Sequence, residues 1–340
     1  MVEVALIGYG YAGRTIHAPL IRAARGLELA AVASSRAGAV HSDYPEMKVA
    51  DLGAVLADAA IDLVVIATPN DLHAPMAHAA LAAGKHVVID KPFCLSVAEG
   101  EALIDHALQA GRMLSVFHCR RWDSNYLTFQ AVRPRLGDIT QLILRYDRWR
   151  PVVRDRWRER FGPGAGIWYD LGSHLLDQAL SLWGLPDWIN ADIAAQRPGA
   201  EADDYFHVIL GYGPMRVILH ASMLTTAPGP AFEVQGSGGA FVKYGMDIQE
   251  NMLKAGRIPG ESGWGVDIED AILTPAEGNG SGTPESIVAT PGNYLAYYEA
   301  VAAAISGRGP NPVPAEDALR VMRLIEAGLD SAKTGRRIGL

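Results

Sequence analysis

The chain has 340 residues, of which 49% are hydrophobic and 20% are charged, a composition that excludes an extensively disordered protein. Its length is well above that of a common single-core domain, so two packed domains are expected. Thirty basic and 38 acidic residues give a net charge of −8, which argues against a protein built to coat nucleic acid.

The first 117 residues alternate short apolar runs with longer helical patterns. The short runs are aliphatic and followed by turn residues, so they predict buried strands. The stretches between them carry apolar residues at three- and four-residue spacing, and Gly84 and Gly111 suit helix C-caps. A doubly wound parallel sheet follows, with strands at residues 2–7, 29–34, 63–67, 86–89 and 113–117 and helices at 13–24, 51–59, 71–83 and 96–110.

Beyond about residue 118, apolar runs joined by short turns, such as Gly213-Pro214 and residues 237–239, predict the hairpins of an antiparallel sheet. We therefore expect a dinucleotide-binding Rossmann domain at residues 1–118 and an α+β domain at 119–340, with the closing helices able to pack on either. The expected strands are residues 139–149, 206–212, 215–221, 231–235 and 240–244, the expected helices are 170–183, 294–305 and 315–331, and residues 278–284 are the most loop-like stretch.

Cysteine usage and the N-terminus bear on the compartment. Cys94 and Cys119 are the only cysteines, too few for a disulfide framework or a cysteine-rich metal site, so a reducing compartment is expected. The start of the chain lacks a secretory-signal pattern and no long uncharged apolar run follows, which predicts a cytoplasmic protein without a membrane partner. The ten histidines include no H-E-x-x-H pattern, and we expect no metal.

The first predicted strand runs into a glycine-rich turn that opens the first helix, with the pattern G-x-G-x-x-G. Such glycines permit a tight turn, a close backbone approach to a pyrophosphate, and close packing of helix on sheet. The turn therefore predicts dinucleotide binding, the alternative being a purely structural glycine turn. The residues concerned are Gly8, Gly10, Tyr11, Ala12 and Gly13.

The end of the second predicted strand bears on the choice of cofactor. An NAD-binding unit places a carboxylate here for the ribose hydroxyls, but this chain has Ser34, Ser35 and Arg36. Hydroxyls and a guanidinium would bind a 2′-phosphate through charge-assisted hydrogen bonds of about 1.5–3 kcal/mol each. We expect NADP, with NAD as the second choice; the alternative is that Arg36 is simply a solvated loop residue.

Polar residues follow the third and fourth predicted strands of this series. In a doubly wound sheet, residues just past the carboxyl ends of strands line the ligand crevice. Lys91 follows one strand and is placed where a cationic donor could meet a substrate hydroxyl or the nicotinamide ribose; the alternative is a surface lysine. Past the other strand, Thr68, Pro69, Asn70 and His73 are expected to contact the cofactor.

A second constellation lies on the helix expected at residues 170–183. Spacings of four and three put Asp170, His174 and Asp177 on one face, so that a carboxylate can orient an imidazole. Hydride transfer from a secondary alcohol needs a base for the hydroxyl proton, and this pair could supply it. In the alternative interpretation, Asp170 is a helix N-cap and His174 a satisfied, partly buried histidine.

Arginines are frequent between residues 120 and 160, interleaved with tryptophans. In an acidic chain such a strip is more often a solvated strand face, an ion-paired interface, or a lid over a hydroxyl-rich substrate than a nucleic-acid site.

Taken together, these motifs resemble the Gfo/Idh/MocA oxidoreductase family. The resemblance rests on the glycine turn, on Thr68-Pro69-Asn70 with His73, on Asp90-Lys91-Pro92-Phe93, and on Asp170-x-Gly172-x-His174-x-x-Asp177, which fall in the family's order. The segments 10–20, 120–123, 170–178 and 204–207 resemble the branch that contains NADP-dependent scyllo-inositol dehydrogenases.

The resemblance implies an oxidoreductase acting on a ring hydroxyl of a cyclic polyol, most of all scyllo-inositol, and assembling as a homodimer or homotetramer through the exposed face of its second sheet. It implies that Lys91, Asp170 and His174 are catalytic and that Arg120 and Trp122 bind substrate. Asp90 replaces the family's usual glutamate, and Cys119 replaces the branch's common asparagine. The alternatives are a dehydrogenase of another sugar and a nucleotide-binding sensor without turnover.

Overall fold

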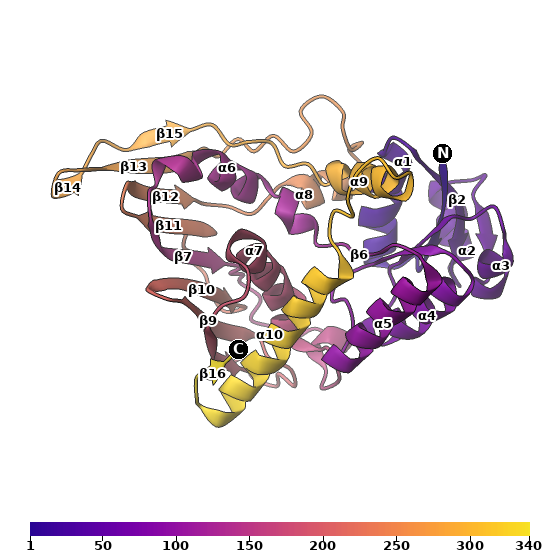
Figure 1. Cartoon of the computed structure of the whole chain (residues 1–340), viewed down its shortest axis with the longest axis horizontal. Coiled ribbons are helices and arrows are strands. Elements are labelled where there is room, and N and C mark those ends of the chain that lie inside the picture. The colour runs from indigo at the N-terminus through magenta and orange to yellow at the C-terminus, as the bar shows by residue number, and fades with distance from the viewer. The chain divides into compact units, whose positions relative to one another are not determined.

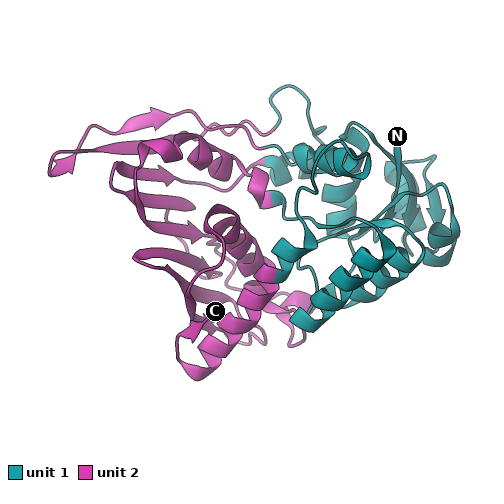
Figure 2. Cartoon of the chain, viewed as in Figure 1, with its two compact units in different colours: residues 1–119, 249–264, 293–319 teal, residues 120–248, 265–292, 320–340 magenta.

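A computed structural model describes all residues, 1–340, and the chain forms two compact units (Figure 2). Unit 1 contains residues 1–119, 249–264 and 293–319, and unit 2 contains residues 120–248, 265–292 and 320–340. The chain therefore leaves unit 1 after Cys119 and returns to it twice. No helix is long and apolar enough to cross a bilayer.

Unit 1 is built on a six-stranded sheet in the order β3-β2-β1-β4-β5-β6, and all its strand pairs are parallel. β4 and most of β1 and β5 are fully buried, as expected for aliphatic strands covered on both faces. The strand order reverses between β1 and β4, which makes their carboxyl ends the topological switch point. The strands are β1 (Val2–Ile7), β2 (Leu27–Ala33), β3 (Lys48–Ala50), β4 (Leu63–Ile66), β5 (His86–Ile89) and β6 (Leu114–Val116).

Helices flank this sheet: α4 lies beside α5, and α1 lies beside α9 (Figure 1). The helices of unit 1 are α1 (Ala18–Ala23), α2 (Ala37–Asp43), α3 (Leu52–Ala57), α4 (His73–Ala82), α5 (Val97–Ala110), α8 (Gln249–Lys254) and α9 (Leu295–Ile305), and the first residues of α10 (Ala315–Thr334) also belong to it. The predicted C-caps are confirmed in geometry, because Gly84 and Gly111 have φ of 73° and 61°.

Unit 2 is built on a ten-stranded sheet in which every pair is antiparallel except β7 with β10. Helices α6, α7 and α10 lie on one face of this sheet (Figure 1). The strands are β7 (Ile139–Arg145), β8 (Trp188–Ala194), β9 (Tyr205–Tyr212), β10 (Met215–Ser222), β11 (Phe232–Gly236), β12 (Gly239–Lys243), β13 (Ala271–Glu277), β14 (Gly280–Ser281), β15 (Glu285–Ile287) and β16 (Ile338–Gly339), and the helices are α6 (Ser124–Val132) and α7 (Ser173–Trp183).

The expected fold class, a doubly wound parallel sheet with a second, predominantly antiparallel sheet, is confirmed. The hairpins expected at Gly213-Pro214 and at residues 237–239 are also confirmed by the β9–β10 and β11–β12 pairings. The strand expected to reach residue 149 was predicted too long. It ends at Arg145, and beyond it Trp149 forms only an isolated bridge before Pro151, which has no N–H to donate.

Two expected α-helices begin with a π-helical turn. Residues Gly13–His17 form the π turn η1 ahead of α1, and residues Trp168–Gly172 form the π turn η6 ahead of α7. The helix expected from residue 71 likewise begins as the 3₁₀ turn η2 (Asn70–Leu72). Isolated π turns are rare and occur frequently at functional sites, and both of these fall in segments that carry the predicted site residues.

Candidate functional site

The turn between β1 and η1 has a conformation that two of its glycines make possible. Gly8 has φ of +95°, and a Cβ there would lie 2.5 Å from the carbonyl oxygen of Ala67, at the end of β4. A Cβ on Gly13 would lie 2.0 Å from the carbonyl oxygen of Gly8. Any side chain at these two positions would collide with backbone, so the turn itself requires both glycines.

Gly10 is different, because a Cβ built on it meets no atom within 4 Å and its φ is not positive. The protein's own packing therefore does not require a glycine at this position. Open space above the second glycine, next to the first turn of a helix, is what a pyrophosphate needs to approach the backbone. The residues present in this turn thus fit a dinucleotide.

The end of β2 carries no carboxylate at residues 34–36. Ser35 and Arg36 are exposed, and the backbone N–H of Arg36 donates to Oγ of Ser34 over 3.0 Å. The nearby acidic residue Asp43, at the end of α2, is held by Arg14, whose Nε and Nη2 donate to it over 2.6 and 2.7 Å. The hydrogen bonds from Arg14 lower the pKa of Asp43, so this carboxylate stays paired with a cation.

His73 joins the carboxyl ends of β4 and β5. It is buried, with Nδ1 2.8 Å from the carbonyl oxygen of Pro92 and Nε2 3.0 Å from that of Thr68. These contacts tie together the two strand ends that carry Asn70, which is buried, and Lys91, which is half-buried. Binding of the cofactor by these residues stays a prediction.

In unit 2, the π turn η6 is anchored by a carboxylate from a distant loop. Asp203 accepts a hydrogen bond from the backbone N–H of Trp168 over 2.7 Å, and its own carbonyl accepts one from the N–H of Ile167 over 3.0 Å. Gly166 packs so closely on Asp203 that a Cβ would lie 1.9 Å from its Oδ1. Burial raises the pKa of Asp203 to about 6, although the backbone N–H groups act in the opposite direction.

The two predicted catalytic residues of unit 2 follow this anchor. Asp170 lies inside the π turn, with its Oδ1 3.7 Å from Nε of Arg158, and is therefore not the N-cap of the alternative interpretation. His174 is the second residue of α7 and is 6% exposed. Because the turn before α7 is π-helical, the α-helical spacing used to place Asp170 and His174 on one face does not hold strictly.

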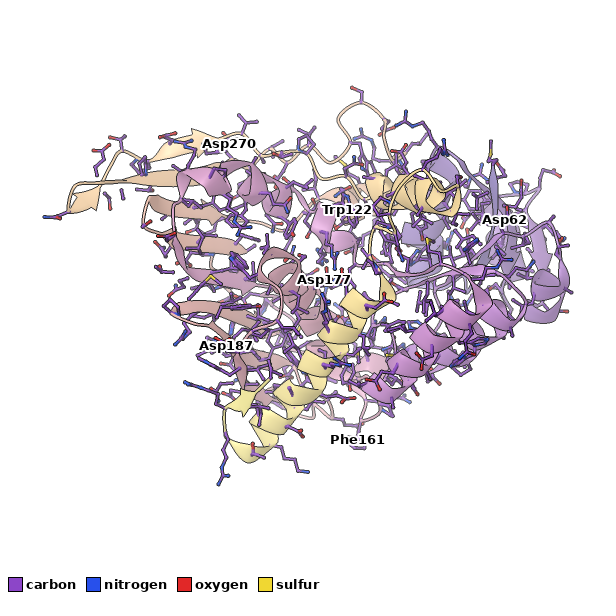
Figure 3. All side chains as sticks on the ribbon, viewed as in Figure 1. Asp62, Trp122, Phe161, Asp177, Asp187 and Asp270 are labelled. Carbon is purple, nitrogen blue, oxygen red and sulfur yellow. The ribbon has the colours of Figure 1, made fainter.

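The carboxylate three residues after His174, Asp177, is paired with an arginine. Arg121 donates to it from Nη2 over 2.7 Å and from Nε over 3.0 Å, and both residues lie in unit 2. Figure 3 shows Asp177 and Trp122 on the helical side of the sheet of unit 2. Asp177 thus compensates a guanidinium in the interior of the unit.

Arg120, predicted to bind substrate, is buried and held by several groups of unit 2. Its Nη1 donates to Asp123 over 3.0 Å, its Nη2 donates to the Tyr146 hydroxyl over 2.7 Å, and its carbonyl accepts from Gln178 over 2.9 Å. The guanidinium orientation is therefore set by the protein before any ligand binds. Substrate contacts of Arg120 and of the half-buried Trp122 stay predictions.

The arginine-rich strip contains several ion pairs, which favours the ion-paired interpretation among those left open by the sequence. Arg145 pairs with Glu233 over 3.0 Å and Arg156 with Glu159 over 2.8 Å. Arg160 pairs with Asp155. An arginine paired in this way offers less free positive charge to a phosphate backbone than an unpaired one.

Sequence reasoning missed the supporting residues Asp43 and Asp203. Asp203 acts on a residue 35 positions earlier in the chain, and Arg14 acts on Asp43 from 29 positions away. Neither pair has a characteristic spacing, so no local signal could have identified them. The glycines at 8 and 13, by contrast, belong to a pattern that spans only six residues, and they were identified from the sequence.

Comparisons with known proteins agree with this architecture. A family model described as "Oxidoreductase family, NAD-binding Rossmann fold" matches residues 2–118, and one described as "Oxidoreductase family, C-terminal alpha/beta domain" matches residues 131–340. The matches confirm the resemblance inferred from the motifs and assign NAD binding to the first domain.

Curated relatives and solved structures match along almost the whole chain. The uncharacterized oxidoreductase YdgJ of Escherichia coli is 51% identical over 336 residues, covering 98% of this chain and 96% of that protein. The scyllo-inositol 2-dehydrogenase (NADP(+)) IolW of Bacillus subtilis is 40% identical over 344 residues, covering 100% and 96%. The structure of a putative oxidoreductase from Yersinia pestis is 47% identical in sequence and has a TM-score of 0.96. The match covers 100% of this chain and 97% of that chain.

Proposed function

This chain belongs to the Gfo/Idh/MocA oxidoreductase family, and from that premise we propose that it is an NADP-dependent dehydrogenase of a cyclic polyol, with scyllo-inositol as the expected substrate. The observation that carries the proposal is the presence, in one chain, of a glycine turn with open space at Gly10 and of a buried histidine, His174, that follows a carboxylate on a π turn. A nucleotide sensor would need the first of these features but not the second.

The preference for NADP is supported by the end of β2. Ser34, Ser35 and Arg36 offer hydroxyls, a backbone turn and an exposed guanidinium, and no carboxylate among them would repel a 2′-phosphate. Asp43 is the nearby anion, and Arg14 compensates its charge. The relative IolW, which is named as an NADP(+)-dependent enzyme, supports this choice.

In the proposed reaction, bound NADP supplies the acceptor for the hydride that leaves the carbinol carbon. The hydroxyl proton then needs a base, and we assign it to the imidazole of His174, which returns the proton in the reverse direction. Asp170 orients the reacting hydroxyl, and the Lys91 ammonium donates hydrogen bonds to it and to the nicotinamide ribose. Arg120, held in place by Asp123, is assigned to a neighbouring substrate hydroxyl.

The test is the absorbance of the reduced cofactor, followed with NADP and with NAD across a panel of inositol isomers, aldoses and glycosides. Turnover of scyllo-inositol with NADP is the expected result. Turnover confined to another sugar would keep the dehydrogenase and replace the substrate. No turnover of any compound, with NADPH still bound in a fluorescence titration, would favour the sensor.

Two variants test the residue assignments. His174→Ala should lower kcat by roughly 10² to 10⁴ with NADPH binding intact, the range for a positioned acid–base group. His78→Ala is the matched control, because His78 pairs with His106 between α4 and α5 of unit 1. Arg36→Ala should weaken NADP much more than NAD, and equal loss of both would place the phosphate elsewhere.

We also propose that copies of the chain assemble through the face of the unit 2 sheet opposite its helices. The registers of four strand pairs align five residues across that face, and four of them are apolar: Ile209 of β9, Ile218 of β10, Ile143 of β7 and Val242 of β12. The fifth, Glu233 of β11, lies between Ile143 and Val242. An apolar row on an uncovered sheet face is costly to leave in water. Light scattering coupled to size exclusion tests this, with Ile218→Lys expected to yield monomers.

A further inference from the structure

Behind the turn that carries Lys91, unit 1 holds a buried chain of three polar side chains. His17, the last residue of η1, is completely buried, and its Nδ1 lies 2.5 Å from the hydroxyl oxygen of Tyr298 on α9. Its Nε2 lies 3.6 Å from Oδ1 of Asp90, the residue that follows β5. The ring of Phe117 packs against His17, with 4.6 Å between the ring centroids, and covers His17 on another side.

One arrangement of protons fits these contacts, in which His17 and Asp90 interact as neighbouring polar groups at 3.6 Å, a separation longer than a hydrogen bond. Burial raises the pKa of Tyr298 well above its ordinary value, and the charges of Tyr297, Asp90 and Cys119 act in the same direction. Tyr298 therefore keeps its proton, and with Nδ1 of His17 unprotonated its hydroxyl donates a hydrogen bond to that nitrogen. The ring proton of His17 then stands on Nε2 and faces the Asp90 carboxylate.

Asp90 is an anion in this setting. Burial by itself would raise the pKa of this carboxyl, but the interaction with His17 and the charges of Lys91 and His73 lower it to about 2. The carboxylate also accepts a hydrogen bond from the backbone N–H of Lys91 over 2.9 Å. Asp90 thus fixes the peptide group from which the Lys91 side chain departs.

The segment 90–92 is consequently held on both sides by buried histidines. His17 faces the Asp90 carboxylate, and Nδ1 of His73 contacts the Pro92 carbonyl oxygen over 2.8 Å. We propose that His17 is a positioning residue for Lys91: through Asp90 it keeps the Lys91 turn in the one orientation in which the ammonium serves the reaction. This inference rests on the role that the proposed function gives to Lys91.

The proposal predicts a change in cofactor binding that a purely structural histidine would not cause. Replacing His17 with leucine removes the group that faces Asp90 and returns the carboxyl pKa toward the range in which burial neutralises it. We expect the Kd of NADPH to rise about tenfold, the order set by one hydrogen bond to a charged group, and to rise further as the pH falls and the Asp90 carboxylate is protonated. His17→Gln, which keeps a donor, should restore a pH-independent Kd.

The experiment measures the Kd of NADPH by fluorescence from pH 5 to 9, and the melting temperature, for the full chain and for His17→Leu, His17→Gln, Tyr298→Phe and Lys91→Ala. Tyr298→Phe removes only the hydroxyl and should shift the Kd in the same direction as His17→Leu, which keeps the test open if the leucine variant fails to fold. A lower melting temperature with unchanged Kd in both variants would overturn the proposal.

Lys91→Ala separates this inference from the function on which it rests. If Lys91→Ala leaves both NADPH binding and turnover unchanged, the role assigned to Lys91 is wrong, and the inference about His17 is lost with it. If Lys91→Ala impairs either one while His17→Leu and Tyr298→Phe change only stability, the proposed function survives and the inference alone is refuted.

Discussion

Asp203, the carboxylate that anchors the π turn before His174, is expected to lower the unfolding free energy of the chain at neutral pH. Burial raises the pKa of Asp203 from its ordinary 3.8 to about 6. Between these values the folded chain keeps a proton that the unfolded chain has released, so stability is highest below pH 3.8 on this account and is lost as the pH rises through 6. The difference corresponds to at most about 3 kcal/mol of unfolding free energy above pH 6.

Asp203→Asn removes the charge and keeps an oxygen that can accept the Trp168 N–H, and its near-identical size suits the close contact with Gly166. The variant and the parent chain should have similar unfolding free energies at pH 4. The variant should become the more stable of the two as the pH rises to 7, by up to about 3 kcal/mol.

Urea unfolding at unit steps from pH 4 to 8, followed by tryptophan fluorescence, measures the effect. Asp105→Asn is the control, because Asp105 is exposed on α5 and its removal should leave the pH profile unchanged. A stability difference between Asp203→Asn and the parent that does not vary with pH would refute the claim that burial raises the pKa of Asp203.

Two further predictions concern the nucleotide turn and an ion pair inside unit 2. Gly10→Ala should change the unfolding free energy by less than about 0.5 kcal/mol and still weaken NADPH binding. Gly13→Ala should lower the unfolding free energy by more than about 3 kcal/mol, because its Cβ would meet the Gly8 carbonyl. Equal NADPH affinity of Gly10→Ala and the parent in a fluorescence titration would contradict the assigned pyrophosphate site. The Lys243 ammonium lies 2.8 Å from the buried carboxylate of Asp267, and Lys243→Met removes this partner. The unfolding free energy, measured with urea at neutral pH, should fall by about 3–5 kcal/mol. The double variant Lys243→Met/Asp267→Leu should recover most of that loss.

Local patterns were sufficient for much of the fold and for the nucleotide turn. β1 was predicted with its observed bounds because an aliphatic run that ends in glycines has few other stable conformations. Helices and strands with weak periodicity or few residues were missed, because they gain their order from neighbours: α2, α6, α8, β3, β8 and β13–β16, of which β14 lies in the stretch 278–284 that was expected to be loop. The π turns at Gly13–His17 and Trp168–Gly172 were read as α-helix, since hydrophobic spacing does not distinguish the two over one turn.

The sequence by itself determined which residues could carry the chemistry, because a glycine turn, a lysine after a strand and a histidine near a carboxylate are each defined within a few positions. Only the tertiary structure decided how these residues are supported. Asp203 caps Trp168 across 35 positions, and His17 contacts Tyr298 across 281. A polar group needs a partner once it is buried, and which partner is near depends on how the chain packs rather than on sequence spacing.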